Sequence, residues 1–392
     1  MVLGLAAISQ LPFAYNRYRI YRLASNIDRL RSERKVHTDR GYRDLKGVIH
    51  VHSFLGGHST GSFDELISAA DRDGLDFVVM TEHVSELYDT SQKTLRGRHG
   101  RALWLGGNEL STSDGDRFLV IDGFEGLSGF QRKRTKDLLA AAEERGDLAV
   151  LAYPKGNSLA ASGANGIEVL SLNTSAKRMN PFMFLFDGLW SYGAYPELTL
   201  ARYLERPDKE LALFDSVSSR RRTILFAGND AHSNVGVHLG DDANNRWIDL
   251  KYDRYSMIFR LLRTHVLLPD AEPLTRDTLV DALKKGNSYA SIDALSDPGG
   301  FGFWAVTGEG WLPMGSEISL SPSGSTLKVE VPLKSRVVLY RDGKPVREEK
   351  DTFGFDDTVR ERGVYRVEVY LDSLGSHFGK MPWIISNPIF VR

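Results

Sequence analysis

Between Gly47 and Ala294 the sequence alternates short apolar runs with amphipathic stretches, and this pattern limits the chain to a β/α architecture. Strands are expected at Val48–His52, Leu75–Met80, Ala102–Leu105, Phe118–Ile121, Leu148–Tyr153, Gly166–Ser171 and Thr223–Ala227. Helices are expected after the capping box Ser62–Glu65, over Thr135–Arg145 and over Thr278–Lys285. A pattern of about 250 residues suits one closed or nearly closed barrel of parallel strands, which we place at 47–297.

The pattern changes after Asp297. The segment Thr326–Leu333 (TLKVEVPL) alternates apolar and polar residues, and Gly363–Leu371 does so again. Asp342-Gly343 stands between two apolar runs, which is a strong signal for a β-hairpin. Short strands at this spacing predict a small all-β sandwich over residues 298–392.

Residues 1–46 precede the barrel pattern and allow two interpretations. Met1–Tyr15 is largely apolar, but it is shorter than the roughly 20 residues that span a bilayer. Basic and aromatic residues, from Tyr15 to Arg22, follow directly, as at a membrane interface. The segment is therefore either a helix packed on the body or a membrane-proximal segment. In the second case the protein lies at or outside the inner membrane of a bacterium; otherwise it is cytoplasmic.

The chain has no cysteine among its 392 residues, which excludes disulfides, thiolate catalysis and Cys-based metal sites. Any metal site must therefore use His, Asp and Glu. The formal net charge of -1 gives no strong signal for nucleic-acid binding. Composition does not set the oligomeric state.

Metal-ligand side chains follow the expected strands at the ends where the strands stop. His50 and His52 lie two residues apart, so both side chains leave the same face of the sheet. Because the carboxyl ends of parallel strands meet at one rim, the sequence predicts one metal site there. The candidate ligands are His50, His52, His58, His83, Glu109, Asp230 and His232. The remaining histidines, expected on the surface or in the core, are His37, His99, His238, His265 and His377.

These motifs resemble the PHP superfamily, the polymerase and histidinol phosphatase phosphoesterases. The resemblance rests on the segment from His50 to His83, on GNEL at Gly107–Leu110 and on GNDAHS at Gly228–Ser233. It implies a distorted (β/α)7 TIM-like barrel with up to three metal ions. The C-terminal region is similar to the β-sandwich appended to some larger bacterial members.

Carried over from the family pattern, the seven candidates divide into two sets. His50, His52, Glu109 and Asp230 would hold the first ion, and Glu109 would bridge to a second ion and position the activated water. A further ion would be held by His58, His83 and His232.

The sequence departs from the family pattern at the second ion. Tyr153 stands where many members have His, and the His or Cys expected a few residues past the strand that contains Glu168 is missing. The resemblance therefore implies two or three divalent ions, and nitrogen and carboxylate ligands suit Zn, Mn or Fe. Tyr153 and Lys155 are candidate substrate contacts on the same rim, and Glu82, in place of Asp, is expected to lie behind the ligands.

The reaction that fits best is hydrolysis of a phosphate ester by a metal-activated water, on a small phosphorylated metabolite or nucleotide. Two alternatives remain open. The protein could be a non-catalytic, metal-stabilised binding or scaffold protein of the cell envelope. It could also be a C–N bond hydrolase of the amidohydrolase type, although those enzymes commonly need a lysine bridge where Glu109 stands here.

Overall fold

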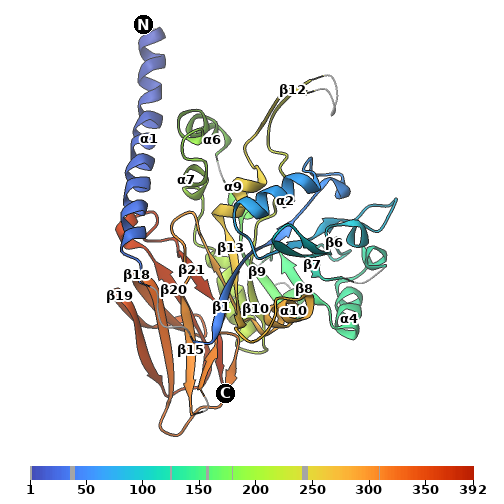
Figure 1. Ribbon diagram of the computed structural model, residues 1–392, viewed down its shortest axis with the longest axis vertical. Coiled ribbons are helices and arrows are strands. Elements are labelled where there is room, and N and C mark those ends of the chain that lie inside the picture. Colours follow the sequence, from blue (N-terminus) through green and yellow to red (C-terminus); the bar gives the residue numbers. More distant parts are fainter. Residues whose placement is uncertain are drawn as a thin grey trace.

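The computed structural model describes residues 2–35, 40–123, 126–155, 159–178, 180–240, 246–308 and 310–392, and within them the chain is a mixed α/β protein. Two sheets carry the α/β part, and a strand-rich region follows at the C-terminus (Figure 1). His37 lies outside these residues, as does the side chain of His238.

The first sheet is built around β1 (Tyr42–Val51), which lies parallel to β2 (Phe77–Met80). β2 lies parallel to β5 (Ala102–Leu105), and β4 (Gly97–His99) closes that edge. On its other side β1 pairs antiparallel with β13 (Arg263–Pro269), which pairs with β14 (Ser288–Ser291). The apolar runs of the sequence thus form buried strands, as expected for strands covered on both faces.

The second sheet has the order β10-β9-β8-β7-β6-β3. β8 (Leu148–Ala152), β9 (Gly166–Ser171) and β10 (Ile224–Gly228) are parallel, as the sequence predicts. In contrast, β7 (Arg117–Ile121) is antiparallel to both β6 (Gly107–Ser111) and β8. The expectation of parallel strands is wrong at this point because the turn between β6 and β7, with Gly115 at φ +85, is too short for a parallel crossover.

The two sheets meet at the ends of β1 and β10. The Asn229 N–H donates to the Ile49 carbonyl at 2.9 Å, and the His52 N–H donates to the Ala231 carbonyl at 3.0 Å. The chain that leaves β2 forms the short β3 (Glu82–His83), which pairs parallel with β6. The ends of β1, β3, β6 and β10 therefore come together, while the closed (β/α)7 barrel itself stays a prediction.

Helices lie where the sequence predicts them. α2 (Phe63–Arg72) begins at Ser62 with the predicted capping box to Glu65. α4 (Thr135–Arg145) ends at a left-handed Gly146, and α10 (Arg276–Lys285) packs near β13. The other elements of this part are α3 (Thr90–Lys93), α5 (Leu172–Arg178), α6 (Pro181–Asp187), α7 (Pro196–Ala201), α8 (Asp208–Ser218), β11 (Gly236–Gly240), β12 (Arg246–Lys251) and α9 (Tyr255–Leu261), with the π-helical turn η4 (Gly188–Tyr192).

The C-terminal region is rich in strands, and the hairpin at Asp342-Gly343 is confirmed between β18 (Ser325–Arg341) and β19 (Lys344–Val359). β18 also pairs with β20 (Gly363–Tyr370) and with β15 (Gly302–Thr307). β20 pairs with β21 (Ile384–Ser386), and β21 pairs with β14. The remaining strands are β16 (Gly310–Pro313), β17 (Glu317–Ile318) and β22 (Ile389–Val391).

The pairing of β14 with β21 joins this region to the first sheet, so one continuous sheet crosses the predicted boundary near residue 298. Asn387 reinforces the junction, because its amide accepts from the Leu225 N–H at 2.7 Å and donates to the Leu225 carbonyl at 3.0 Å. A separate sandwich domain stays a prediction.

At the N-terminus, α1 (Val2–Ser32) is a long helix with two different halves. Ile20, Leu23, Ile27 and Leu30 of its second half are buried in the core. The first half extends away from the body beside α6 (Figure 1). Among the described residues, none of the helices combines the length and the apolar character needed to cross a lipid bilayer.

Candidate metal centre

The end of β1 carries two of the expected ligands, His50 and His52, and both are buried. The strand is not regular here: the register with β2 shifts between Ile49 and Val51, and His50 has φ +70. A left-handed residue inside a strand is typical of a bulge that re-aims side chains. The two imidazoles therefore face one another across a bulge, with ring centroids 5.1 Å apart, rather than along an undistorted pleat.

Glu109 on β6 and Asp230 after β10 complete a group of four ligands with these histidines. Asp230 Oδ1 lies 3.3 Å from His50 Nε2 and 3.2 Å from His52 Nε2. Glu109 Oε2 lies 3.6 Å and 3.5 Å from the same two nitrogens. A tetrahedral ion with ligand bonds of about 2.0–2.2 Å separates its ligand atoms by about 3.3–3.6 Å. The four side chains thus have the spacing of ligands around one ion.

The same atoms are buried without hydrogen-bond partners. They are His50 Nε2, His52 Nε2, Glu109 Oε2 and Asp230 Oδ1. A buried polar atom without a partner costs about 1–3 kcal/mol, and more if it is charged, so four in one place need a compensating ligand. A divalent cation fits this donor set, since it can accept all four lone pairs at once.

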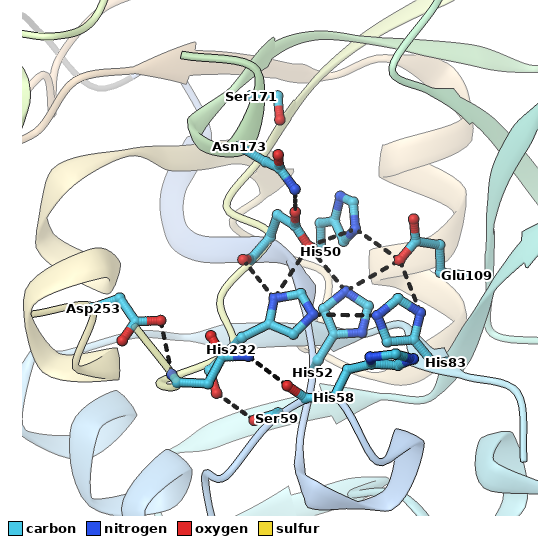
Figure 2. A network of polar contacts seen from close by, with 12 residues as sticks. His50, His52, His58, Ser59, His83, Glu109, Ser171, Asn173, His232 and Asp253 are labelled. Carbon is cyan, nitrogen blue, oxygen red and sulfur yellow. Dashed lines mark hydrogen bonds and ion pairs between the residues drawn. The ribbon is translucent and has the colours of Figure 1, made fainter. Parts of the chain in front are cut away.

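A second group adjoins the first and consists of His52, His83 and His232. The Nε2 atoms of His83 and His232 lie 3.2 Å apart, and the His52 ring stacks on both rings at 4.4 Å and 4.2 Å. Figure 2 shows the rings of His50, His52, His83 and His232 turned toward one another with Glu109 at their edge. His58 is exposed; its ring lies 4.9 Å from His83, at the border of this group and outside both ligand sets.

Buried carboxylates behind the ligands fix their orientation. His50 Nδ1 donates to Glu168 Oε2 at 2.7 Å, which leaves Nε2 to face the site. Glu82 accepts from the Ser53 N–H at 2.9 Å, from the Ser53 hydroxyl and from Thr94, so it holds the loop that follows His52. This agrees with the expectation for Glu82. The contact of Glu168 with His50 was not predicted, although a charged residue inside the apolar run GIEVLS is a signal for such a role.

Electrostatics hold His52, His83 and Glu109 in the protonation states that bind a cation. Burial lowers the pKa of His52 to about 3 and that of His83 to about 4, so both imidazoles are neutral at pH 7. Burial opposes ionisation of Glu109, but the nearby positive charge of His50 lowers its pKa to about 2. For His50, burial acts against the charged form, but the carboxylates of Glu168 and Asp230 raise the pKa well above its usual value. His50 therefore carries a proton on each nitrogen while no ion is bound, and a cation that binds there must displace the proton from Nε2.

The outer oxygens of the two ligand carboxylates have protein partners. The Tyr153 hydroxyl donates to Asp230 Oδ2 at 2.6 Å, and the Asn173 amide donates to the same oxygen. Arg117 donates to Glu109 Oε1 at 3.1 Å. Each carboxylate therefore turns one oxygen toward His50 and His52, and its other oxygen accepts hydrogen bonds from protein side chains. Asn173 and Arg117 were not predicted, because no local pattern marks either position.

A cavity of about 610 Å³ opens onto this arrangement. His58, Arg117, Tyr153, Asn173 and His232 contribute to its wall. The guanidinium of Arg117 and the ammonium of Lys177 lie over the Tyr153 ring, at 5.6 Å and 5.0 Å from its centroid. Lys155, the other candidate substrate contact, is exposed, is not part of this wall, and its Nζ donates to the Gly115 carbonyl at 3.0 Å.

Comparisons with known proteins find distant structural similarity only. No model of a known protein family matches the chain, and no curated protein is significantly similar to it in sequence. A two-domain protein from Bacteroides vulgatus ATCC 8482, which contains a predicted PHP-like metal-dependent phosphoesterase, is 14% identical with a TM-score of 0.40. That alignment covers 91% of this chain and 98% of the other. PsfC from Pseudomonas syringae PB-5123 is 16% identical with a TM-score of 0.40, over 64% of this chain and 94% of that one.

Proposed function

We propose that the protein is a metal-dependent hydrolase of phosphate esters, with the distorted (β/α)7 barrel of the PHP superfamily. The observation that carries this proposal is the set of four buried, unpartnered atoms at the ends of β1 and β10 and on β6. The substrate class is a small phosphorylated metabolite or nucleotide.

His50, His52, Glu109 and Asp230 would hold a divalent ion, which would supply Lewis acidity to activate a water molecule. The protein contributes the geometry around it. Glu168 keeps His50 in the tautomer that presents Nε2, and Tyr153 with Asn173 fixes the rotation of the Asp230 carboxylate. Arg117 is suited to contact the phosphoryl oxygens, because it is half exposed in the cavity wall and its planar guanidinium can bond two oxygens at once.

The outer carboxylate oxygens support a site for two ions rather than three. The first ion belongs to the group of His50, His52, Glu109 and Asp230, and the second to His83 and His232 beside it, with His58 within reach. A third ion beside Glu109 and Asp230 would have to compete with Arg117, Tyr153 and Asn173, which bind the outer oxygens of these carboxylates. Tyr153→His tests this: metal analysis by mass spectrometry should show a partial rise above the wild-type stoichiometry.

The proposed function is tested by measuring metal content and turnover on the same protein sample. The purified protein is loaded with Zn, Mn or Fe, its bound metal is measured by mass spectrometry, and hydrolysis of p-nitrophenyl phosphate is followed. We expect about two ions per chain and turnover that a chelator abolishes. Bound metal without turnover on any phosphate ester, together with retained partner binding in His50→Ala, would favour the scaffold alternative. Turnover on amides but not on phosphate esters would favour the amidohydrolase type.

A further inference from the structure

Exposed apolar side chains gather at one end of the molecule. Of the sixteen large hydrophobic side chains that are exposed in the described residues, eleven lie in two segments, α1 and α6–η4. We call eight of them the tip surface: Leu5, Ile8, Leu11, Phe182, Met183, Leu185, Leu189 and Trp190. Phe182 is 72% exposed and Leu189 is 68% exposed, which is costly for side chains of this size in water.

The two segments are far apart in the sequence but form one surface. The rings of Phe13 and Phe186 stack with centroids 4.9 Å apart. The indole of Trp190 donates to Gln10 Oε1 at 3.1 Å, and Arg17 donates to the Trp190 carbonyl at 2.7 Å. Figure 1 shows α1 and α6 side by side at the end of the molecule that points away from the C-terminal sheet.

The tip surface carries no exposed charge. The sequence from Val2 to Asn16 contains no Asp, Glu, Lys or Arg. Asp187, the one charged residue from Pro181 to Tyr192, is buried and is bonded by Asn16, Arg202 and Tyr203. An apolar helix end with this composition gains free energy by entering the acyl region of a bilayer.

Aromatic and basic residues follow the tip surface along α1. Tyr15, Tyr18 and Tyr21 are exposed, and tyrosine is enriched where a protein crosses the headgroup region. A cavity of about 410 Å³ lies at the same level, and its basic lining residues are Arg19, Arg22, Arg202 and His377. Among the described residues, Arg19 and Arg22 have no ion pair with a carboxylate, whereas Arg202 is paired with Asp187 at 3.2 Å. This order, apolar and then aromatic and basic, complements a bilayer with anionic phosphate headgroups.

From this arrangement we propose that the tip surface docks on an anionic lipid bilayer, with Leu5, Phe182 and Leu189 entering the acyl region. Arg19 and Arg22 then lie at the level of the lipid phosphates. The inference goes beyond the proposed hydrolase function and does not depend on it, because none of these residues touches the metal centre.

The test is binding of the full chain to lipid vesicles, measured by flotation. Wild-type protein should bind vesicles of phosphatidylcholine with phosphatidylglycerol. The affinity of the double variant F182D/L185D for these vesicles should be lower by roughly tenfold or more, since two charges replace apolar side chains that enter the bilayer. The double variant R19E/R22E should lose the preference for phosphatidylglycerol over phosphatidylcholine alone. Matched controls are L87D and V346D, which change exposed apolar residues elsewhere and should bind like the wild type.

Two results would overturn the proposal. One is equal vesicle binding by the wild type and F182D/L185D. The other is a wild-type protein that does not bind vesicles and forms a stable oligomer in light scattering, while F182D/L185D is monomeric. A second copy of the chain would then cover the tip surface. Thermal unfolding of each variant checks folding, and the substituted side chains are exposed, so unchanged midpoints are expected.

Discussion

The α/β part of the molecule buries two histidine–carboxylate clusters, and they differ in whether their polar atoms are satisfied. In the first, His50 has a partner at Nδ1 and none at Nε2. In the second, His265 has a partner at each nitrogen, with Asp44 at 2.8 Å from Nδ1 and Asp293 at 3.2 Å from Nε2. Both histidines are completely buried, so burial alone does not separate a ligand site from a structural one.

The two clusters also differ in charge. Burial opposes the charged form of His265, but Asp44 and Asp293 raise its pKa to about 10, so it is a cation that completes an internal ion triad. His52 is neutral, with a pKa of about 3. The first cluster therefore combines unpartnered nitrogens with a neutral imidazole, His52, which suits it to receive a cation, whereas the second cluster already contains one.

The largest expected effect is at Glu109. Glu109→Gln keeps the shape of the side chain and removes the charge that faces the first ion, so metal stoichiometry should fall and turnover should drop by several orders of magnitude. Metal analysis and p-nitrophenyl phosphate hydrolysis measure both. The matched control is the exposed Glu348→Gln, which should leave both unchanged. Unchanged metal stoichiometry in Glu109→Gln would contradict the assignment of the first cluster as a metal site, because Glu109 would then not be a ligand.

The second cluster should respond in stability and not in metal content. Asp293→Ala leaves the buried His265 cation with one carboxylate, so the free energy of unfolding should fall by about 3–5 kcal/mol. Denaturant unfolding measures this change, and mass spectrometry should find wild-type metal content in the folded fraction. Loss of bound metal in this variant would mean that the two clusters are not independent.

The pH dependence of stability tests whether His265 in the second cluster is a cation. A group whose pKa is raised on folding stabilises the protein below its unfolded pKa, about 6.5 for His, and this contribution is lost as pH rises through about 10. The free energy of unfolding should therefore fall by a few kcal/mol between pH 7 and pH 10.5. In His265→Leu the decrease over this range should be smaller than in the wild type, and parallel curves for the two proteins would contradict the assignment.

The smallest effect is expected at Tyr153. Tyr153→Phe keeps the ring beside Arg117 and Lys177 and removes one of two hydrogen bonds to Asp230 Oδ2, while Asn173 keeps the other. One hydrogen bond is worth about 1 kcal/mol, so turnover should fall by about fivefold with unchanged metal content. A loss as large as that of Glu109→Gln would mean that Tyr153 acts directly on the substrate.

The sequence predicted that the candidate ligands lie together because most of them stand at the end of an apolar strand, and the rule that strand ends share a rim needs no long-range information. Six of the seven candidates belong to the two ligand groups of the structure, and His58 lies beside them. Arg117 escaped prediction because its place depends on β7 running antiparallel to β6, which follows from a turn rather than from periodicity. The partners of His265 escaped because Asp44 and Asp293 lie far from it in sequence and carry no motif.

The sheet that passes from β14 into β21 has a consequence for how the protein can be divided. A chain that ended before Gly302 would leave β14 as an open edge of backbone donors and acceptors, and Leu225 would lose the amide of Asn387. Open edges of this kind pair with strands of other molecules and lead to aggregation. The C-terminal strands thus pair with an edge that the α/β part cannot leave exposed. We therefore expect the α/β part to need the C-terminal strands in the same chain to stay soluble.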